Sequence, residues 1–201
     1  MSHFICPTRS KISVLLFLVF MTFSGARLQA QAVGGGLTGG ITSSQIDGDA
    51  WGGYNFWGYQ LGGFATYSFN DKLALQIEIL NTYRGSREAG ISRIALQFID
   101  VPIIFRFRKE TAKGDLDGEF GLSGNLLLSG KTGLRGFTFD QTENFRRLSS
   151  ELHLGGAFYL AENAGLFARW SLSLSNLQSD PQLRPWLTIH YFTAGLRIRL
   201  K

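Results

Sequence analysis

Apolar and polar residues alternate with a period of two along most of the chain from Val33 to Leu200. In the clearest stretch, 57–69, residues 57, 59, 61, 65, 67 and 69 are apolar or aromatic, whereas residues 58, 60, 62, 66 and 68 are small or polar. Successive side chains of a β-strand point to opposite faces, so this pattern predicts a strand with one apolar and one polar face. No stretch with helical periodicity competes with it.

The same pattern predicts eight strands, over residues 33–43, 57–69, 73–84, 93–108, 116–129, 150–160, 165–176 and 186–200. The strand at 93–108 changes phase near Asp100-Val101-Pro102. Proline inside a sheet usually needs an irregular position, so a β-bulge is expected there.

The connections between these strands alternate between short and long. Short turns follow 57–69, 93–108 and 150–160, and longer segments follow the other strands. This asymmetry is typical of bacterial outer-membrane barrels, whose short turns lie in the periplasm and whose long loops lie outside the cell. We therefore expect both ends of the barrel domain on the periplasmic side.

Strands can cross a bilayer only as a closed cylinder, because every backbone N–H and C=O needs a partner inside the protein. The fold predicted is an all-β, eight-stranded antiparallel up-and-down transmembrane β-barrel. An eight-stranded interior is narrow enough for side chains to fill, so a broad aqueous pore is not expected.

The polar strand faces carry charges that such a barrel would enclose. We expect an interior charge network that plugs the barrel, formed by Glu78, Arg106, Arg108, Asp117, Glu119, Glu151, Arg169, Arg197 and Arg199. Opposite charges at similar depth on adjacent strands can pair, and a confined charge without a partner is costly. The alternative interpretation is a path for protons or ions.

Residues 1–30 have the pattern of a cleavable signal peptide, which leaves 31–201 as the barrel domain. Arg9 and Lys11 precede an apolar run at 12–23 that is too short to span a bilayer. Small residues favour cleavage after Ala30, with Ala32 as the alternative, and an uncleaved anchor is the other interpretation. The only cysteine, Cys6, leaves with the signal.

Charge and composition exclude several classes of function. Without the signal, which holds three basic and no acidic residues, the net charge falls from +5 to +2, so there is no basic footprint for nucleic acid. The two histidines of the barrel domain lack paired carboxylates at metal-binding spacing, so neither a metal nor another cofactor is expected.

A long loop is expected at 130–149, and it contains basic and aromatic residues. The candidate contacts with lipopolysaccharide or an envelope protein are Lys131, Arg135, Phe137, Phe139, Arg146 and Arg147. A merely solvated loop is the alternative interpretation.

Several motifs together resemble the PorT-like outer-membrane β-barrel family of Bacteroidetes. They are Ala30-Gln31-Ala32, the glycine-rich first strand, Tyr83-Arg84-Gly85-Ser86, Phe98-Ile99-Asp100-Val101-Pro102-Ile103, Gly155-Gly156 and Ala168-Arg169-Trp170. The resemblance implies a small integral barrel of the Gram-negative outer membrane, usually without an assigned activity. One branch of that family takes part in type IX secretion, and these motifs do not separate that branch from the others.

The function expected is therefore non-enzymatic: a monomeric outer-membrane barrel that is structural or binds a partner through its surface loops. Besides a type IX secretion subunit, two alternatives remain. A lipid-modifying enzyme would use Ser149-Ser150-Glu151-Leu152-His153, but no serine is expected against the imidazole. A soluble lipocalin-like carrier would keep its apolar residues inside.

Overall fold

The computed structural model describes residues 33–49, 52–88, 92–112, 114–180 and 186–200; the predicted signal peptide lies outside them. Its elements are β1 (Val33–Asp47), β2 (Phe56–Ser68), β3 (Leu73–Glu88), β4 (Ser92–Thr111), β5 (Gly114–Leu134), β6 (Phe137–Asp140), the 3-10 helix η1 (Thr142–Asn144), β7 (Leu148–Ala161), β8 (Ala164–Ser173) and β9 (Thr188–Leu200). Among these residues no helix is long and apolar enough to cross a membrane.

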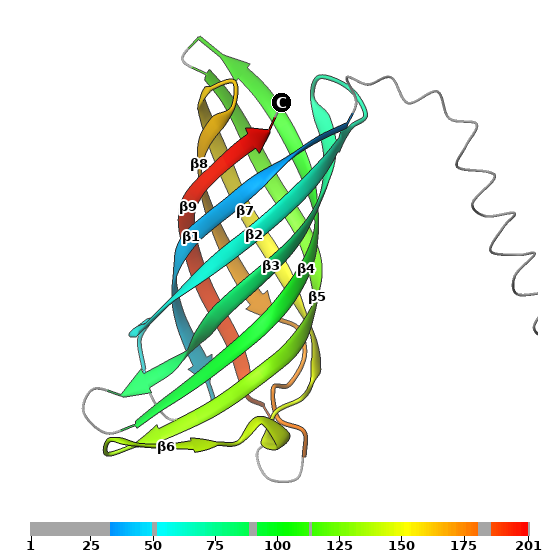
Figure 1. Ribbon diagram of the computed structural model, residues 1–201. Helices are drawn as coiled ribbons and strands as arrows, with labels where there is room; N and C mark the ends of the chain where they lie inside the picture. Colours follow the sequence, from blue (N-terminus) through cyan, green and yellow to red (C-terminus); the bar gives the residue numbers. More distant parts are fainter. Residues whose placement is uncertain (1–32, 50–51, 89–91, 113, 181–185, 201) are drawn as a thin grey trace, which may run out of the picture. The chain divides into compact units, whose positions relative to one another are not determined.

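Eight of the strands close an antiparallel barrel (Figure 1). Each barrel strand pairs with its neighbours along the chain, and β1 pairs with β9 to complete the cylinder. The strand β6 pairs only with the end of β5, as a hairpin that extends beyond the barrel. The predicted eight-stranded up-and-down barrel is confirmed.

The two ends of the barrel differ. Close turns join β2 to β3, β4 to β5 and β7 to β8 at one end, where β1 begins and β9 finishes. We call this the turn end, and it is uppermost in Figure 1. The opposite end, the loop end, carries β6, η1 and the described residues 174–180 that follow β8.

The bulge expected near Pro102 in the fourth strand is absent from β4. Even-numbered residues from Leu96 to Arg106 face the interior without interruption, and the pairing of β3 with β4 keeps one register. The register shift lies instead between β4 and β5, where Gln97 pairs with Ser129 and Phe98 with Leu127. The apparent phase change arises because Leu96 and Phe98 are apolar residues that point inward.

The loop expected at 130–149 is largely ordered as a hairpin. The strand β5 continues to Leu134, turns through Arg135 and Gly136, and pairs with β6. Both turn residues have positive φ, 46° and 91°, as a two-residue hairpin turn of type I′ requires. Lys131 is therefore a strand residue of β5, and Phe137 and Phe139 belong to β6.

Apolar residues face outward and charged residues inward over the barrel strands. Large exposed side chains such as Leu61, Ile79, Leu122 and Leu196 form an outer belt, with aromatic residues toward both of its ends, as a lipid-facing surface requires. A soluble carrier would have the opposite arrangement, so the lipocalin-like alternative does not fit this fold.

Candidate functional site

The turn-end half of the lumen holds three arginines and three carboxylates from five strands. This ionic core consists of Glu78, Arg106, Asp117, Glu119, Arg169 and Arg197, all at most 5% exposed. Arg169 binds Glu78 through two N–O contacts of 2.8 Å and reaches Glu119 at 3.0 Å. Arg197 bridges the same two carboxylates, and Arg106 pairs with Asp117.

The equal numbers of charges explain how the ionic core is tolerated. Burial of an ion costs roughly several kcal/mol of hydration free energy. Only well-oriented opposite charges and hydrogen bonds offset that cost. Each guanidinium of the core contacts a carboxylate, and Gln76 donates to Glu78 Oε1 at 2.6 Å. Strand alternation places all six side chains inside the lumen, so the strands that bury them also supply their partners.

Arg108 and Arg199 surround the turn-end side of the ionic core and are partly exposed. Arg108 Nε lies 3.1 Å from Asp117, and Arg199 stacks over the ring of Tyr159 at 3.6 Å. Together with Glu151, the structure thus places all nine residues expected for the network inside the barrel or at its turn-end rim.

A second cluster lies nearer the loop end, and sequence reasoning identified only Glu151 within it. Arg84 donates to Asp100 at 2.5 Å and to Glu151 at 2.7 Å, and the hydroxyl of Tyr191 donates to Glu151 at 2.8 Å. The alternation of inward and outward residues could have identified both Arg84 and Asp100. Arg84 has the strand parity of Glu78, and Asp100 has that of Arg106.

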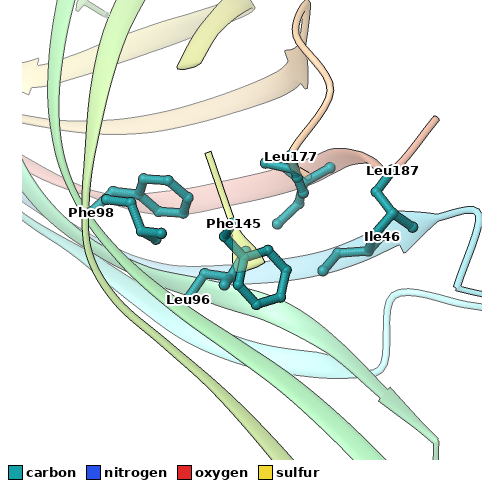
Figure 2. Close-up of a cluster of buried hydrophobic side chains, with 8 residues drawn as sticks. Ile46, Leu96, Phe98, Phe145, Leu177 and Leu187 are labelled. Atoms are coloured by element: carbon teal, nitrogen blue, oxygen red, sulfur yellow. The ribbon is translucent and has the colours of Figure 1, made fainter. Parts of the chain in front are cut away.

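An apolar plug closes the lumen on the loop-end side of this cluster (Figure 2). It consists of Ile46, Leu96, Phe98, Leu127, Phe145, Leu177, Leu187 and Ile189. Phe145 and Leu177 come from the segments after β6 and β8, which are tied together by a hydrogen bond of 2.7 Å from Arg146 N to Leu177 O. The loops therefore fold inward and fill the loop end.

The residues expected to contact external partners remain on the surface. All six are exposed: Lys131, Arg135, Phe137, Phe139, Arg146 and Arg147. They do not form one patch. Arg135 and Phe137 line a groove beside the β5–β6 hairpin, while Arg146 and Arg147 precede β7 outside that groove.

One expectation about histidine chemistry was wrong. A serine does lie against the imidazole of His153: Ser171 Oγ is 2.8 Å from His153 Nδ1. Both residues are buried in the lumen, and Glu151 is bound to Arg84 and Tyr191. The pair therefore lacks both an accessible surface for a substrate and the contact with Glu151 that would orient the imidazole.

Within the described residues, no group of three or more histidine, cysteine, aspartate or glutamate side chains is placed to hold a metal ion.

Comparison with known proteins places this geometry among outer-membrane barrels. A family model described as the outer membrane protein beta-barrel domain matches residues 15–198. Neisserial surface protein A is similar in structure, with a TM-score of 0.56 and 13% identity over 83% of this chain and 97% of that one. Ail, the attachment invasion locus protein of Yersinia pestis, has a TM-score of 0.53 and 18% identity over 84% and 99%. No curated protein sequence matches the chain.

Proposed function

Because the chain belongs to the outer membrane protein beta-barrel domain family, we propose that it is a closed, non-enzymatic membrane platform that presents its loop end to an envelope partner. The barrel anchors the chain in the outer membrane. Its lumen gives rigidity rather than passage, and its functional surface lies outside the cylinder.

The filled lumen is the observation that carries this proposal. The ionic core, the Arg84 cluster and the apolar plug follow one another along the barrel axis, and their side chains are almost fully buried. Ions would have to break these contacts to pass. The paired charges of the ionic core and the Arg84 cluster, together with the apolar plug, instead hold the eight strands and the loops in one arrangement.

The partner surface proposed is the β5–β6 hairpin with the turn that follows it. Phe137 is 71% exposed and Phe139 is 52% exposed, at the loop end where they do not belong to the lipid-facing belt. Exposed aromatic residues beside arginines are enriched in protein interfaces. The hairpin is also held by the barrel through the pairing of Lys131–Leu134 with residues 137–140.

Three measurements test the proposal. Protein reconstituted in planar bilayers should show no steady conductance, and cells carrying Ser171→Ala or His153→Ala should keep their lipid A and phospholipid profiles. Photo-crosslinking from position 137 or 139 in living cells should give one discrete adduct. Crosslinking from position 116, on the lipid-facing belt, is the control. Open channels, a changed lipid profile or equal adducts from both sites would refute the platform role.

The PorT-like resemblance suggests a narrower version of this proposal, in which the partner belongs to a secretion apparatus. Arg84 and Asp100, both part of the motifs that carry the resemblance, bind each other in the lumen. Deletion of the gene should then abolish type IX cargo release. Normal release would leave the general platform role in place and exclude this branch.

Export by a cleavable signal and a monomeric state complete the proposal. The amino terminus of the membrane-inserted protein should be Gln31, or Val33 if cleavage follows Ala32. Light scattering in detergent should give the mass of one chain after correction for bound detergent.

A further inference from the structure

A groove of about 510 Å³ opens on the loop end beside the β5–β6 hairpin. It lies where β2, β3 and β4 reach the loop end, and its lining includes Trp57, Tyr83, Arg87, Glu88, Arg93 and Arg135. Three arginines against one glutamate make the groove cationic. The loop contacts expected from the sequence include Arg135 but neither Arg87 nor Arg93.

Two of the arginines face each other directly across neighbouring strands. Arg87 of β3 pairs in register with Arg93 of β4, and both side chains are exposed. Like charges directly opposite each other on a sheet are destabilising. No carboxylate among the described residues lies within ion-pair distance of either one, although Glu88 lines the same groove. The fold therefore keeps an unfavourable pair of cations that a bound anion would relieve.

The neighbouring strand leaves space for this pair. Gly133 of β5 lies opposite Arg93, and a Cβ at position 133 would come within 2.9 Å of Arg93 Cγ. The glycine thus lets the Arg93 side chain lie along the wall of the groove. Any larger residue would displace that side chain.

Arg135 brings the third cation from the hairpin turn. Its φ of 46° makes it the only non-glycine residue with positive φ in the described part of the chain. Asparagine or aspartate is the usual residue at this position of such a turn, and an arginine there costs about 1 kcal/mol of backbone strain. The turn therefore carries a cation at a position where arginine is not the conformationally preferred residue.

The position of the groove along the barrel axis indicates what kind of anion can reach it. Tyr83 and Trp57, at the loop-end edge of the apolar belt, form part of its lining, and Tyr59 stacks on Tyr83 at 5.9 Å. Arg87 lies four residues beyond Tyr83, which is roughly 10 Å further along the axis of a tilted strand. Aromatic girdles mark the membrane interface, so the arginines lie at the level of the outer-leaflet headgroups.

We propose that this groove binds a phosphate group of a glycolipid in the outer leaflet, the lipid A portion of lipopolysaccharide. Arg87 and Arg93 together hold the phosphate, Arg135 covers it from the hairpin, and Trp57 lies against the sugar or the first part of an acyl chain. Guanidinium groups bind phosphate oxygens through paired, charge-assisted hydrogen bonds. Continuity with the lipid-facing belt favours a lipid over a soluble anion or an acidic protein.

The test uses the full barrel domain refolded in detergent free of lipopolysaccharide. Native mass spectrometry measures the binding of bisphosphorylated lipid A, of the same lipid A after removal of its phosphates, and of inorganic phosphate. The variant is Arg87→Gln with Arg93→Gln. The matched control, Arg146→Gln with Arg147→Gln, removes the same charge from exposed positions outside the groove.

The groove variant should bind bisphosphorylated lipid A about tenfold more weakly or worse, because charge-assisted hydrogen bonds are lost. The control should stay within about twofold of the parent chain. Dephosphorylated lipid A should bind weakly to all three proteins. Without lipid, the groove variant should unfold at the same or a higher denaturant concentration, because the repulsion between the arginines is gone.

Four results would overturn the proposal. These are equal losses in variant and control, equal binding of phosphorylated and dephosphorylated lipid, binding of inorganic phosphate as tight as that of lipid A, and a groove variant that is less stable without lipid. The inference depends on the outer-membrane location alone, so its failure would leave the platform role standing.

Discussion

The guanidinium of Arg84 lies over the ring of Phe98, with its central carbon 4.2 Å from the ring centroid. Phe98 belongs to the apolar plug, whereas Arg84 binds Asp100 and Glu151. One contact therefore joins the charged and the apolar layers of the lumen. A cation over an aromatic face is favourable, and more so where water is excluded.

Replacement of Arg84 by leucine should lower the free energy of unfolding by about 3–5 kcal/mol, because it leaves Asp100 and Glu151 buried without a cation. Urea titration of the barrel in lipid vesicles, followed by tryptophan fluorescence, measures this change. Arg147→Gln, at an exposed position before β7, is the control and should alter stability by no more than about 0.5 kcal/mol. Similar losses for the two variants would contradict the structural role assigned to Arg84.

The pairing of Glu119 with Arg197 should appear as a coupling energy. Glu119→Gln and Arg197→Met each leave an opposite charge unmatched in the ionic core, so each should be strongly destabilising. The double variant restores the balance and should lose less than the sum of the two, by about 1–3 kcal/mol. The same urea titration completes this double-mutant cycle. Additive losses would mean that the two side chains do not interact in the membrane.

Truncation of Phe145 to alanine should loosen the loop-end plug. Its ring fills the apolar cluster together with Leu96 and Leu177, and removal of a buried phenyl group costs about 3 kcal/mol or more. Because local opening exposes the backbone, trypsin should cleave after Arg146 and Arg147 about tenfold faster or more. Phe137→Ala, at a 71% exposed position, should leave the cleavage rate unchanged. No difference between the two variants would argue against the plug.

Arginine in place of Ile79 tests which surface faces lipid. Ile79 is 63% exposed near the middle of the outer belt, where an arginine costs about 2–4 kcal/mol. The control Phe137→Arg places the same residue at the loop end and should be close to neutral. Folding yield into vesicles and the urea midpoint both report the change. Equal stability of the two variants would mean that the apolar belt is not in the bilayer.

The period-two pattern was sufficient to predict the fold and the face on which most residues lie. Strand parity predicted Glu78, Arg169 and Arg197 on the inner face, because a strand that faces lipid with one set of side chains must enclose the other set, and the structure has all three buried. Parity alone also placed Arg84 and Asp100 inside. They were missed because the motifs around them were considered only as marks of family resemblance.

The bulge predicted in the fourth strand was wrong because an apolar side chain can face either lipid or an apolar loop inside the lumen. Leu96 and Phe98 suggested a switch of faces in the fourth strand, yet they point into the lumen because loop residues Phe145 and Leu177 give them an apolar surface there. The sequence pattern does not distinguish an apolar side chain that faces lipid from one that meets a folded-in loop. The β5–β6 hairpin was not predicted for a different reason, because the glycines of this stretch interrupt the alternation of apolar and polar residues.

The sequence by itself determined the closed barrel and its lipid-facing belt, because both follow from local alternation and from the need to pair every backbone group within hydrocarbon. Only the tertiary structure decided which charges meet. Glu78 and Arg169 are separated by 91 positions and are joined across the lumen, and Arg87 faces Arg93 because of the register of two strands. Such contacts depend on strand register, strand tilt and the path of the loops, which arise when the cylinder closes.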